Sequence, residues 1–548
     1  MHVKNSGNKL SACINERSTR SFAYVVAISL LLALAAVGGH WAEAQEPEVR
    51  EVVLIGTNDF ESAIEPLPAF WLEGSPLMGG AAHIKTMVDE IREREGARGN
   101  PVFLFDSGDM FTGLLSRLTY GEILMEMMIT MGYDAMGMGN HEFDYGAANF
   151  LKQANRVPFP VLSCNTYYRG TDILYMQPHA VLERSGVRLG VIGVIGRDAI
   201  SVVVPSLVAD LEFRDPVECV RESVEELRDD VDIVVVLAHQ GKTGPMQSDQ
   251  ENDPSVWRDF EEDIALTSAV PGIDVFFGGH AHRGIDPPYV NPDTGTIIVQ
   301  TFGHGTRLAM LRLKVDTAGG RVLEHEGGLV TPWTADYEPD AIMQLKMDAY
   351  SAEYAAEIAR PVGDFTARLT RKYNVESDLG NFVADVIREI GDAEVGLTNA
   401  GGLRADLPSG PVAEGHVRDA LPFLNHVVVV EMTGTQLLEV LEQGVGLERG
   451  MIQVSGLTVD YDPSAPVGDR LIAVTVGDAP VASERRYRVA TNSFVAEGGD
   501  LYTTFDDLEW VDEIELSLAD AVFECLGRHT GRIALPQRGR LNRQEKPQ

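Results

Sequence analysis

Five apolar stretches of this chain each end in a residue whose side chain can bind a metal ion. They are EVVLIGTND (51–59), PVFLFDSGD (101–109), AMGMGNH (135–141), VDIVVVLAH (231–239) and IDVFFGGHAH (273–282). Continuous aliphatic and β-branched runs are typical of parallel strands that are buried on both faces. In open α/β sheets, ligands bind beyond the carboxyl ends of such strands. The pattern therefore predicts one crevice that gathers Asp59, Asp109, Asn140, His141, His239, His280 and His282.

The order of strand-like and helical stretches predicts more than one domain. At 548 residues the chain is too long for a single compact domain. Strand-like runs alternate with amphipathic stretches over residues 51–335, which predicts an α/β domain. A charge-rich linker helix is expected within residues 336–361. Short strands, glycine-rich turns and helical stretches over residues 362–540 predict a smaller α+β domain.

The first 44 residues have the features of a secretory signal peptide. Four basic residues precede the apolar stretch 22–37, and Ala42-Glu43-Ala44 offers a cleavage site between small residues. The apolar stretch is shorter than the ~20 residues of a membrane span. We therefore predict a periplasmic or secreted protein that has no stable membrane anchor after the signal is cleaved. An uncleaved N-terminal anchor is the alternative.

The charge balance limits the partners of the chain. The formal net charge is −37, which argues against nucleic acid as a partner. It does not argue against a phosphorylated substrate, because bound cations can invert the local field. The cysteines beyond the signal are odd in number and widely spaced, so no disulfide framework is expected. Cys164 lies in an apolar run and is predicted to be a buried thiol.

The residues at the strand ends suit a pair of divalent metal ions. Two such ions can share a bridging carboxylate and a bridging hydroxide, and together they activate water and stabilise a phosphoryl group in transfer. Imidazole with carboxylate suits Zn, Mn, Fe or Co better than Ca. Each motif alone has an ordinary explanation, because an Asp after a strand is often a helix cap. The order and spacing of the whole set favour the metal site.

These motifs resemble those of known metallohydrolases. TND, SGDMFTG, GNHEFDYG, VVVLAHQG and FFGGHAH resemble the calcineurin-like metallophosphoesterases. Downstream, ESDLGNFVADV, LTNAGGLRADLPSGPV, ALPFLNHVVVVEMTG and YRVATNSFVAEGGD resemble the C-terminal domain of the 5′-nucleotidases. The resemblance spans about residues 51–510. It implies an α/β metallophosphoesterase fold, a layered β-sandwich flanked by helices, followed by a smaller α+β domain.

The resemblance also implies a role for each residue at the strand ends. It assigns the first metal ion to Asp59, Glu61, Asp109 and His282. It assigns the second ion to Asp109, Asn140, His239 and His280. The implied catalytic pair is His141, which faces the phosphate and the leaving oxygen, and Asp144, which holds the tautomer of His141. The expected cofactors are two divalent metal ions, with Zn, Mn, Mg and Co as candidates.

One of these positions departs from the family pattern. The family has Asp-x-His where this chain has Asp59-Phe60-Glu61. We expect Glu61 to replace the histidine as an oxygen ligand. That would make the first site harder and move its preference from Zn toward Mn or Mg. The alternative is that Glu61 points away and the first site is weakened.

The resemblance extends to the residues that would bind a nucleotide. The matching residues are Phe423 and Phe494 for the base, Asp500 for the ribose hydroxyls, Arg404 for the substrate, and the neighbouring Asn399 and Asn425. Ordinary core packing is the alternative for the two phenylalanines. Family members carry arginine where this chain has residues 373–375, and Leu501 replaces the last glycine of a GGDG motif. Contacts to the substrate are therefore expected to differ from those of the family.

The residues and the resemblance together predict an enzyme. The expected reaction is hydrolysis of 5′-nucleotides to nucleosides and phosphate by a hydroxide that bridges the metal ions. The alternatives are a UDP-sugar hydrolase or a 2′,3′-cyclic nucleotide phosphodiesterase/3′-nucleotidase. A thiosulfate-ester hydrolase fits less well, because the phenylalanine pair is retained. A non-catalytic nucleotide-binding protein is favoured only by Glu61. The sequence does not determine the base preference or the oligomeric state.

Overall fold

Two six-stranded sheets make up the N-terminal half of the chain. The computed structural model describes residues 48–69, 71–242 and 260–544, which belong to one compact unit. The first sheet contains, in order, β16 (Arg321–Val330), β15 (Leu308–Asp316), β1 (Val49–Thr57), β4 (Val102–Asp106), β5 (Ala135–Gly137) and β6 (Val161–Leu162). The second contains β13 (Tyr289–Val290), β14 (Ile297–Val299), β12 (Val275–Phe277), β11 (Ile233–His239), β9 (Val187–Ile195) and β8 (His179–Arg184).

The two sheets pack face to face, and helices cover their outer faces. Along β1, Val52 and Leu54 join a buried cluster with residues of the second sheet, whereas Val53 and Ile55 pack against helices. Because both faces of β1 are covered, its sequence is apolar at successive positions. The predicted layered β-sandwich flanked by helices is therefore confirmed.

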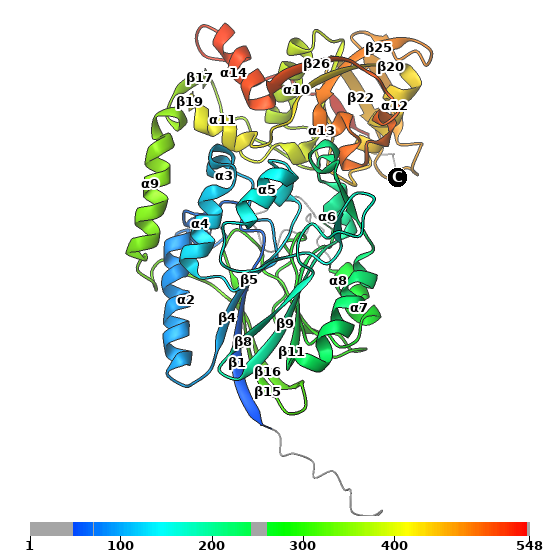
Figure 1. Cartoon of the computed structure of the whole chain (residues 1–548). Helices are drawn as coiled ribbons and strands as arrows, with labels where there is room; N and C mark the ends of the chain where they lie inside the picture. Colours follow the sequence, from blue (N-terminus) through cyan, green and yellow to red (C-terminus); the bar gives the residue numbers. More distant parts are fainter. Residues whose placement is uncertain (1–47, 70, 243–259, 545–548) are drawn as a thin grey trace, which may run out of the picture. The chain divides into compact units, whose positions relative to one another are not determined.

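Four helices provide most of the outer layers. Figure 1 shows α2 (Ala81–Gly96) and α4 (Glu122–Met131) beside the first sheet, and α7 (Pro216–Leu227) and α8 (Glu261–Ala269) beside the second. Their buried side chains belong to the clusters that cover the two sheets.

The central strands end just before the residues predicted to bind metal. β1, β4 and β5 are parallel neighbours, and so are β9, β11 and β12. Their carboxyl ends therefore meet at one edge of the sandwich. β1 ends at Thr57 and β12 at Phe277, so Asp59 and His280 lie on the loops that follow, whereas β11 includes His239. This arrangement brings residues that are far apart in the sequence to one place.

A long helix connects the two halves of the chain. α9 (Ala341–Ile358) begins where the Asp340 side chain accepts hydrogen bonds from the N–H groups of Ile342 and Met343. Such capping satisfies N–H groups that have no partner within the helix. Met343 and Met347 pack into the core that lies under α2 and α4. The helix lies within the predicted linker 336–361, and the domain boundaries themselves stay predictions.

The C-terminal half contains a five-stranded mixed sheet covered on both faces. Its strands are, in order, β21 (Gln453–Ser455), β18 (Val395–Thr398), β25 (Arg486–Asn492), β20 (His426–Thr433) and β26 (Trp510–Ser517). One face packs against α10 (Asp378–Ile390) and α14 (Leu518–Arg528). The other packs against α12 (Gly434–Gly444) and a smaller four-stranded sheet. The prediction of an α+β domain is confirmed.

β25 ends two residues before Phe494. β25 ends at Asn492, whose side chain accepts a hydrogen bond from the N–H of Val495 at 3.1 Å and starts the short helix α13 (Ser493–Ala496). An Asn at a strand end can compete with the β-ladder for backbone groups in this way. Phe494 consequently sits on a helical turn beside a cavity.

Two further predictions concern the termini and the thiols. The predicted signal peptide, residues 1–44, lies outside the described residues. Within the described ranges, no helix combines the length and the apolar character that a membrane crossing requires. Cys164 is buried as predicted, and its burial raises the pKa of the thiol.

Candidate functional site

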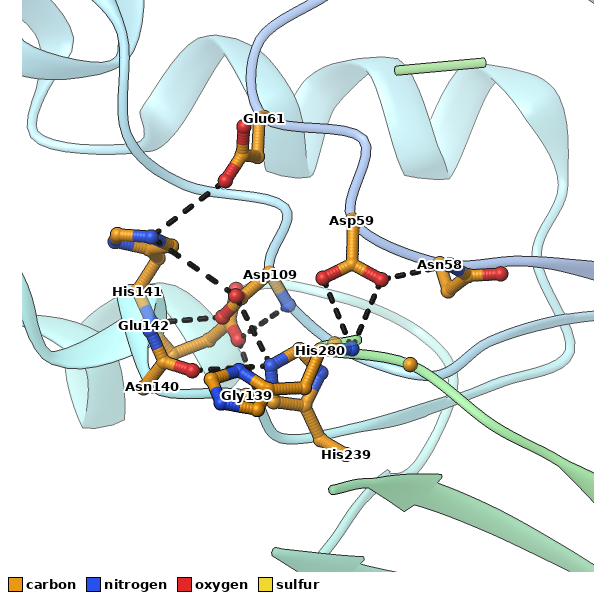
Figure 2. Close-up of polar contacts among 12 residues, drawn as sticks. Asn58, Asp59, Glu61, Asp109, Gly139, Asn140, His141, Glu142, His239 and His280 are labelled. Carbon is orange, nitrogen blue, oxygen red and sulfur yellow. Dashed lines mark hydrogen bonds and ion pairs between the residues drawn. The ribbon is translucent and has the colours of Figure 1, made fainter. Parts of the chain in front are cut away.

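The four residues predicted for the second metal ion lie together. The Oδ2 atom of Asp109 is 2.9 Å from Nε2 of His239, and the same nitrogen is 3.1 Å from Oδ1 of Asn140. Ligand atoms of Asp109, His239 and His280 all lie within 4.8 Å of one another. Figure 2 shows these side chains converging from separate segments of the chain.

His239 and His280 each have one ring nitrogen held by a neighbouring residue and a second ring nitrogen that could bind a metal ion. Nδ1 of His239 lies 2.9 Å from the backbone carbonyl of Ser107, where as an N–H it donates, and Nε2 would then be the nitrogen that binds a metal ion. Nε2 of His280 lies 3.1 Å from Oδ2 of Asp198, and among the described residues its Nδ1 has no hydrogen-bond partner despite being buried. A buried nitrogen without a partner beside a carboxylate and a second imidazole fits a divalent cation.

The residues predicted for the first ion form a looser group. Oδ1 of Asp59 lies 3.3 Å from Nε2 of His282, and Oε1 of Glu61 lies 3.9 Å from the same nitrogen. Both oxygens of Asp59 also accept the backbone N–H of His280 at 3.0 Å. Ligand atoms of Glu61 and Asp109 lie within 4.8 Å of each other, so Asp109 belongs to both groups. This position would allow the carboxylate of Asp109 to be shared by both metal ions.

The backbone at this site adopts an uncommon conformation. Five of the predicted ligands have a positive φ: Asp59 (50°), Glu61 (45°), Asp109 (59°), His280 (68°) and His282 (50°). Each such residue costs on the order of 1–3 kcal/mol, and clusters of them are typical of functional sites. Gly139 is required for a different reason, because a Cβ at this position would lie 2.3 Å from Oδ1 of Asp109.

Glu142 organises the loops that carry the ligands. Its buried carboxylate accepts the backbone N–H groups of Asp109, Met110 and Gly139 at 2.7–2.9 Å. Burial, with a smaller contribution from Asp109, raises the pKa of Glu142 to about 7. Glu142 lies within the GNHEFDYG motif, but no role was predicted for it. Its neighbours in the motif are ligand types, and nothing in the spacing shows that it binds backbone.

His141 and Asp144 form the predicted pair. Nδ1 of His141 lies 3.1 Å from Oδ1 of Asp144, while Nε2 lies 3.5 Å from Oε1 of Glu61. Burial alone would lower the pKa of His141, but the charges of Asp144 and Asp109 raise it to about 10. The imidazole is also stacked on the ring of Phe423, with the centroids 5.8 Å apart. Asp144 therefore favours the protonated imidazole, and the Nε2 atom of His141 faces the ligand cluster.

Glu61 has partners that the sequence did not predict. Its Oε1 accepts a hydrogen bond from Arg404 at 2.7 Å, and its Oε2 is 3.6 Å from Nδ1 of His304. Although burial raises the pKa of Glu61, Arg404 and His304 bring it below its ordinary value. Burial lowers the pKa of His304 to about 4, so this imidazole is neutral and retains a lone pair. Glu61 points into the cluster, not away from it.

Asp198 is a second residue of the candidate site that the sequence motifs did not reveal. It lies on α6 (Arg197–Ser201) and contacts both His280 and Arg449, which is in the C-terminal half. Burial raises the pKa of Asp198, but bonds from His280 and Arg449 bring it below its ordinary value. A carboxylate that accepts the second ring N–H of a histidine ligand orients that ligand.

All six residues predicted to bind the nucleotide line one open cavity with an empty volume of about 730 Å³. They are Asn399, Arg404, Phe423, Asn425, Phe494 and Asp500. Asn140, His141, Asp144 and His280 line the same cavity. The cavity therefore joins the predicted metal ligands to the predicted nucleotide site.

The acidic residue of this cavity is buried beside an amide. Oδ2 of Asp500 accepts a hydrogen bond from the Asn399 side chain at 2.7 Å. Burial raises the pKa of Asp500 to about 6, and the bond from Asn399 limits the rise. Val202, Val204 and Leu207 add an apolar wall to the cavity.

Comparisons with known families divide the chain into two matching parts. Residues 77–284 match the family described as calcineurin-like phosphoesterase. Residues 341–507 match the family described as 5′-nucleotidase, C-terminal domain.

Individual proteins resemble most of the chain. A 5′-nucleotidase of Vibrio cholerae is 26% identical over 537 residues, which are 88% of this chain and 91% of that protein. The trifunctional nucleotide phosphoesterase protein YfkN of Bacillus subtilis is 28% identical over 79% of this chain, which spans only 32% of that longer protein. The crystal structure of a 5′-nucleotidase precursor from Thermus thermophilus is 28% identical, with a TM-score of 0.76 over 91% of this chain and 100% of that one.

Proposed function

This chain belongs to the 5′-nucleotidase family, with a calcineurin-like phosphoesterase domain followed by a 5′-nucleotidase C-terminal domain, and we propose that it hydrolyses 5′-nucleotides to nucleosides and phosphate. The family makes the chain a phosphoric ester hydrolase. The observation that supports this substrate most directly is the cavity, which is lined both by His141 and His280 and by Phe423, Phe494 and Asp500. A phosphate at one end and a base at the other would fit this lining.

Two divalent metal ions are the proposed cofactors. Asp59, Glu61, Asp109 and His282 would hold one, and Asp109, Asn140, His239 and His280 would hold the other. When bound, such ions neutralise charge on phosphoryl oxygens and lower the pKa of water. The buried, unpartnered Nδ1 of His280 and the acidic surroundings support this assignment. Glu61 as an oxygen ligand favours Mn or Mg at the first position.

His141 is the proposed proton donor. Asp144 holds the proton on Nδ1, which leaves the protonated Nε2 directed at the ligand cluster. From there Nε2 can donate to the phosphoryl oxygen or to the departing 5′-oxygen of the nucleoside. General acid catalysis of this kind contributes about 10²–10⁴-fold to a rate. The charge of Asp144 and its hydrogen bond to Nδ1 favour the protonated form of His141.

The C-terminal residues would hold the nucleoside. We propose that Phe423 and Phe494 stack on the base, that Asp500 accepts the ribose hydroxyls, and that Arg404 contacts the substrate. Asn399 supports Asp500 through their hydrogen bond. Asn425 lines the cavity beside Phe423. A signal peptide at residues 1–44 would place this reaction in the periplasm or outside the cell.

A substrate panel tests the proposal. Protein stripped with EDTA is reloaded with Zn, Mn, Mg or Co singly, and phosphate release is measured from 5′-nucleotides, a UDP-sugar, 2′,3′-cyclic nucleotides and 3′-nucleotides. The expected result is metal-dependent release that is fastest from 5′-nucleotides. The name of the YfkN relative, a trifunctional nucleotide phosphoesterase, supports including the cyclic and 3′-nucleotides. Lack of phosphate release with every metal and substrate would refute the enzyme assignment.

A further inference from the structure

Arg449 is a buried cation of the cavity that the proposed reaction leaves without a role. It lies in the loop after α12, and its side chain is 11% exposed. It lines the cavity together with Arg404, Tyr373, Asp500 and His280. A buried arginine in a pocket for an anionic substrate needs an explanation, because charged side chains are buried at a cost unless they are paired.

The guanidinium is paired, but its donors are not all used. Nη1 donates to Oδ2 of Asp198 at 2.9 Å, and Nη2 donates to Oδ1 of Asp198 at 2.7 Å and to Oγ of Ser201 at 2.8 Å. A guanidinium has five N–H donors in a fixed plane. The Nε atom is buried and has no hydrogen-bond partner among the described residues. Arg449 is therefore anchored on one side and has donor capacity left on another.

Arg449 has neighbours in both proposed parts of the site. Asp198, which holds the guanidinium, also accepts the N–H of His280, a proposed metal ligand. Asp500, the proposed ribose acceptor, lines the same cavity as Arg449. In a 5′-nucleotide, the 5′-phosphate is the reacting group and is joined to the ribose through the 5′-oxygen. Arginine suits phosphate because it keeps its charge and donates charge-assisted hydrogen bonds, and here Nε and the second N–H of Nη1 are the donors that Asp198 and Ser201 leave unused.

We propose that Arg449 binds the phosphate group of the nucleotide and that Asp198 holds the guanidinium in position for it. This inference rests on the proposed function, because it requires a nucleotide in the cavity. It makes Arg449 a determinant of selectivity for nucleotides over nucleosides. The ion pair with Asp198 then serves the substrate as well as the packing of the two halves of the chain.

Calorimetric titration of the metal-loaded full chain distinguishes this role from a purely structural one. The probes are adenosine and a nonhydrolysable AMP analogue in which a methylene group replaces the ester oxygen. Arg449→Gln is expected to weaken binding of the analogue by roughly 10–100-fold, the usual effect of losing hydrogen bonds to a charged group, and to change adenosine binding less than about twofold. Arg449→Lys keeps the charge but not the planar donors, so it is expected to weaken binding of the analogue by an intermediate factor.

Arg418→Gln is the matched control. Arg418 is 13% exposed and pairs with Glu414 at 2.7 Å, but it does not line the cavity. This variant is expected to bind both probes like the wild type, and metal analysis of all variants checks that two ions remain. Equal losses for analogue and adenosine, or no loss for the analogue, would overturn the inference while leaving the proposed function intact. A wild-type chain that binds no nucleotide would overturn both. If Arg449→Gln fails to fold, Arg449→Lys gives the same comparison.

Discussion

The carboxylate of Glu61 and the guanidinium of Arg404 lie 2.7 Å apart, and both side chains are buried. One belongs to the proposed first metal site and the other to the proposed nucleotide site. Glu61 also lies 3.5 Å from His141 and 3.6 Å from His304. A metal ion and Arg404 would therefore compete for the carboxylate of Glu61. A substrate phosphate and Glu61 would compete for the guanidinium of Arg404.

Glu61→Gln tests whether this carboxylate binds metal. The amide keeps the size but loses the charge, so we expect the metal content to fall from two ions toward one and metal affinity at the first site to fall at least 10–100-fold. Elemental analysis of dialysed protein measures the content. Glu95→Gln is the control, because Glu95 is also buried and pairs with an arginine, Arg312, at 2.7 Å far from the site. Unchanged metal content in Glu61→Gln would show that Glu61 is not a ligand.

Asp198→Asn tests the positioning of His280. The variant loses the charge that orients the imidazole and pairs with Arg449, so affinity for the second ion should fall by about 10–100-fold. Titration of metal-free protein with Mn²⁺ or Zn²⁺ gives the affinity. Asp134→Asn is the matched control for Asp198→Asn, because the Asp134 side chain is equally exposed (13%) and pairs with Arg184. If both variants bind metal equally well, Asp198 has only a structural role.

Phe494→Leu tests stacking on the base. The leucine keeps the site apolar but removes the aromatic face, which is worth roughly 1–3 kcal/mol per stacked base. Adenosine binding should weaken by the corresponding factor of about 5–150. Turnover of a phosphate monoester that has no base should fall far less. A similar loss for both compounds would indicate that Phe494 only supports the fold.

The raised pKa of Asp500 leads us to expect that nucleoside binding depends on pH. Its carboxylate must be ionised to accept two ribose hydroxyls, and burial raises its pKa to about 6. Binding favours the ionised form, so affinity for adenosine should rise with pH up to about 6 and level off above 7. Calorimetry between pH 5 and 8 measures this slope. Asp500→Asn should bind weakly at every pH without the slope, and a slope retained in this variant would assign it to another group.

The predicted part of the site was visible because each ligand follows a strand with both faces buried. Such strands are apolar without interruption, so the first polar residues, Thr57 and Asp106, mark the carboxyl ends, and Asp59 and Asp109 follow shortly after them. Parallel pairing then brings these ends together. The same signal located the sandwich and its helical layers, because the helices need an apolar face against each sheet.

The missed residues act through contacts that leave no local pattern. Asp198 is 82 residues from His280 and 251 from Arg449 along the chain. Neither its neighbours nor its spacing distinguishes it from a surface acid. His304 likewise meets Glu61 only through the tertiary structure, and so does Arg404, which was predicted to contact the substrate but not Glu61. Sequence motifs identify the side chains that would contact metal and substrate, whereas the side chains that orient them depend on packing between distant segments.

The left-handed backbone at five proposed ligands has a consequence for the evolution of this site. At such positions glycine would relieve the steric cost, and a sequence selected for stability alone would accept it. The chain instead keeps carboxylates and imidazoles at Asp59, Glu61, Asp109, His280 and His282. Substitutions that relax these loops should raise the melting temperature of the metal-free protein and abolish its response to metal. In the loops at the strand ends, stability and function therefore favour different residues. Packing in the rest of the fold has to offset the free-energy cost of the strained backbone.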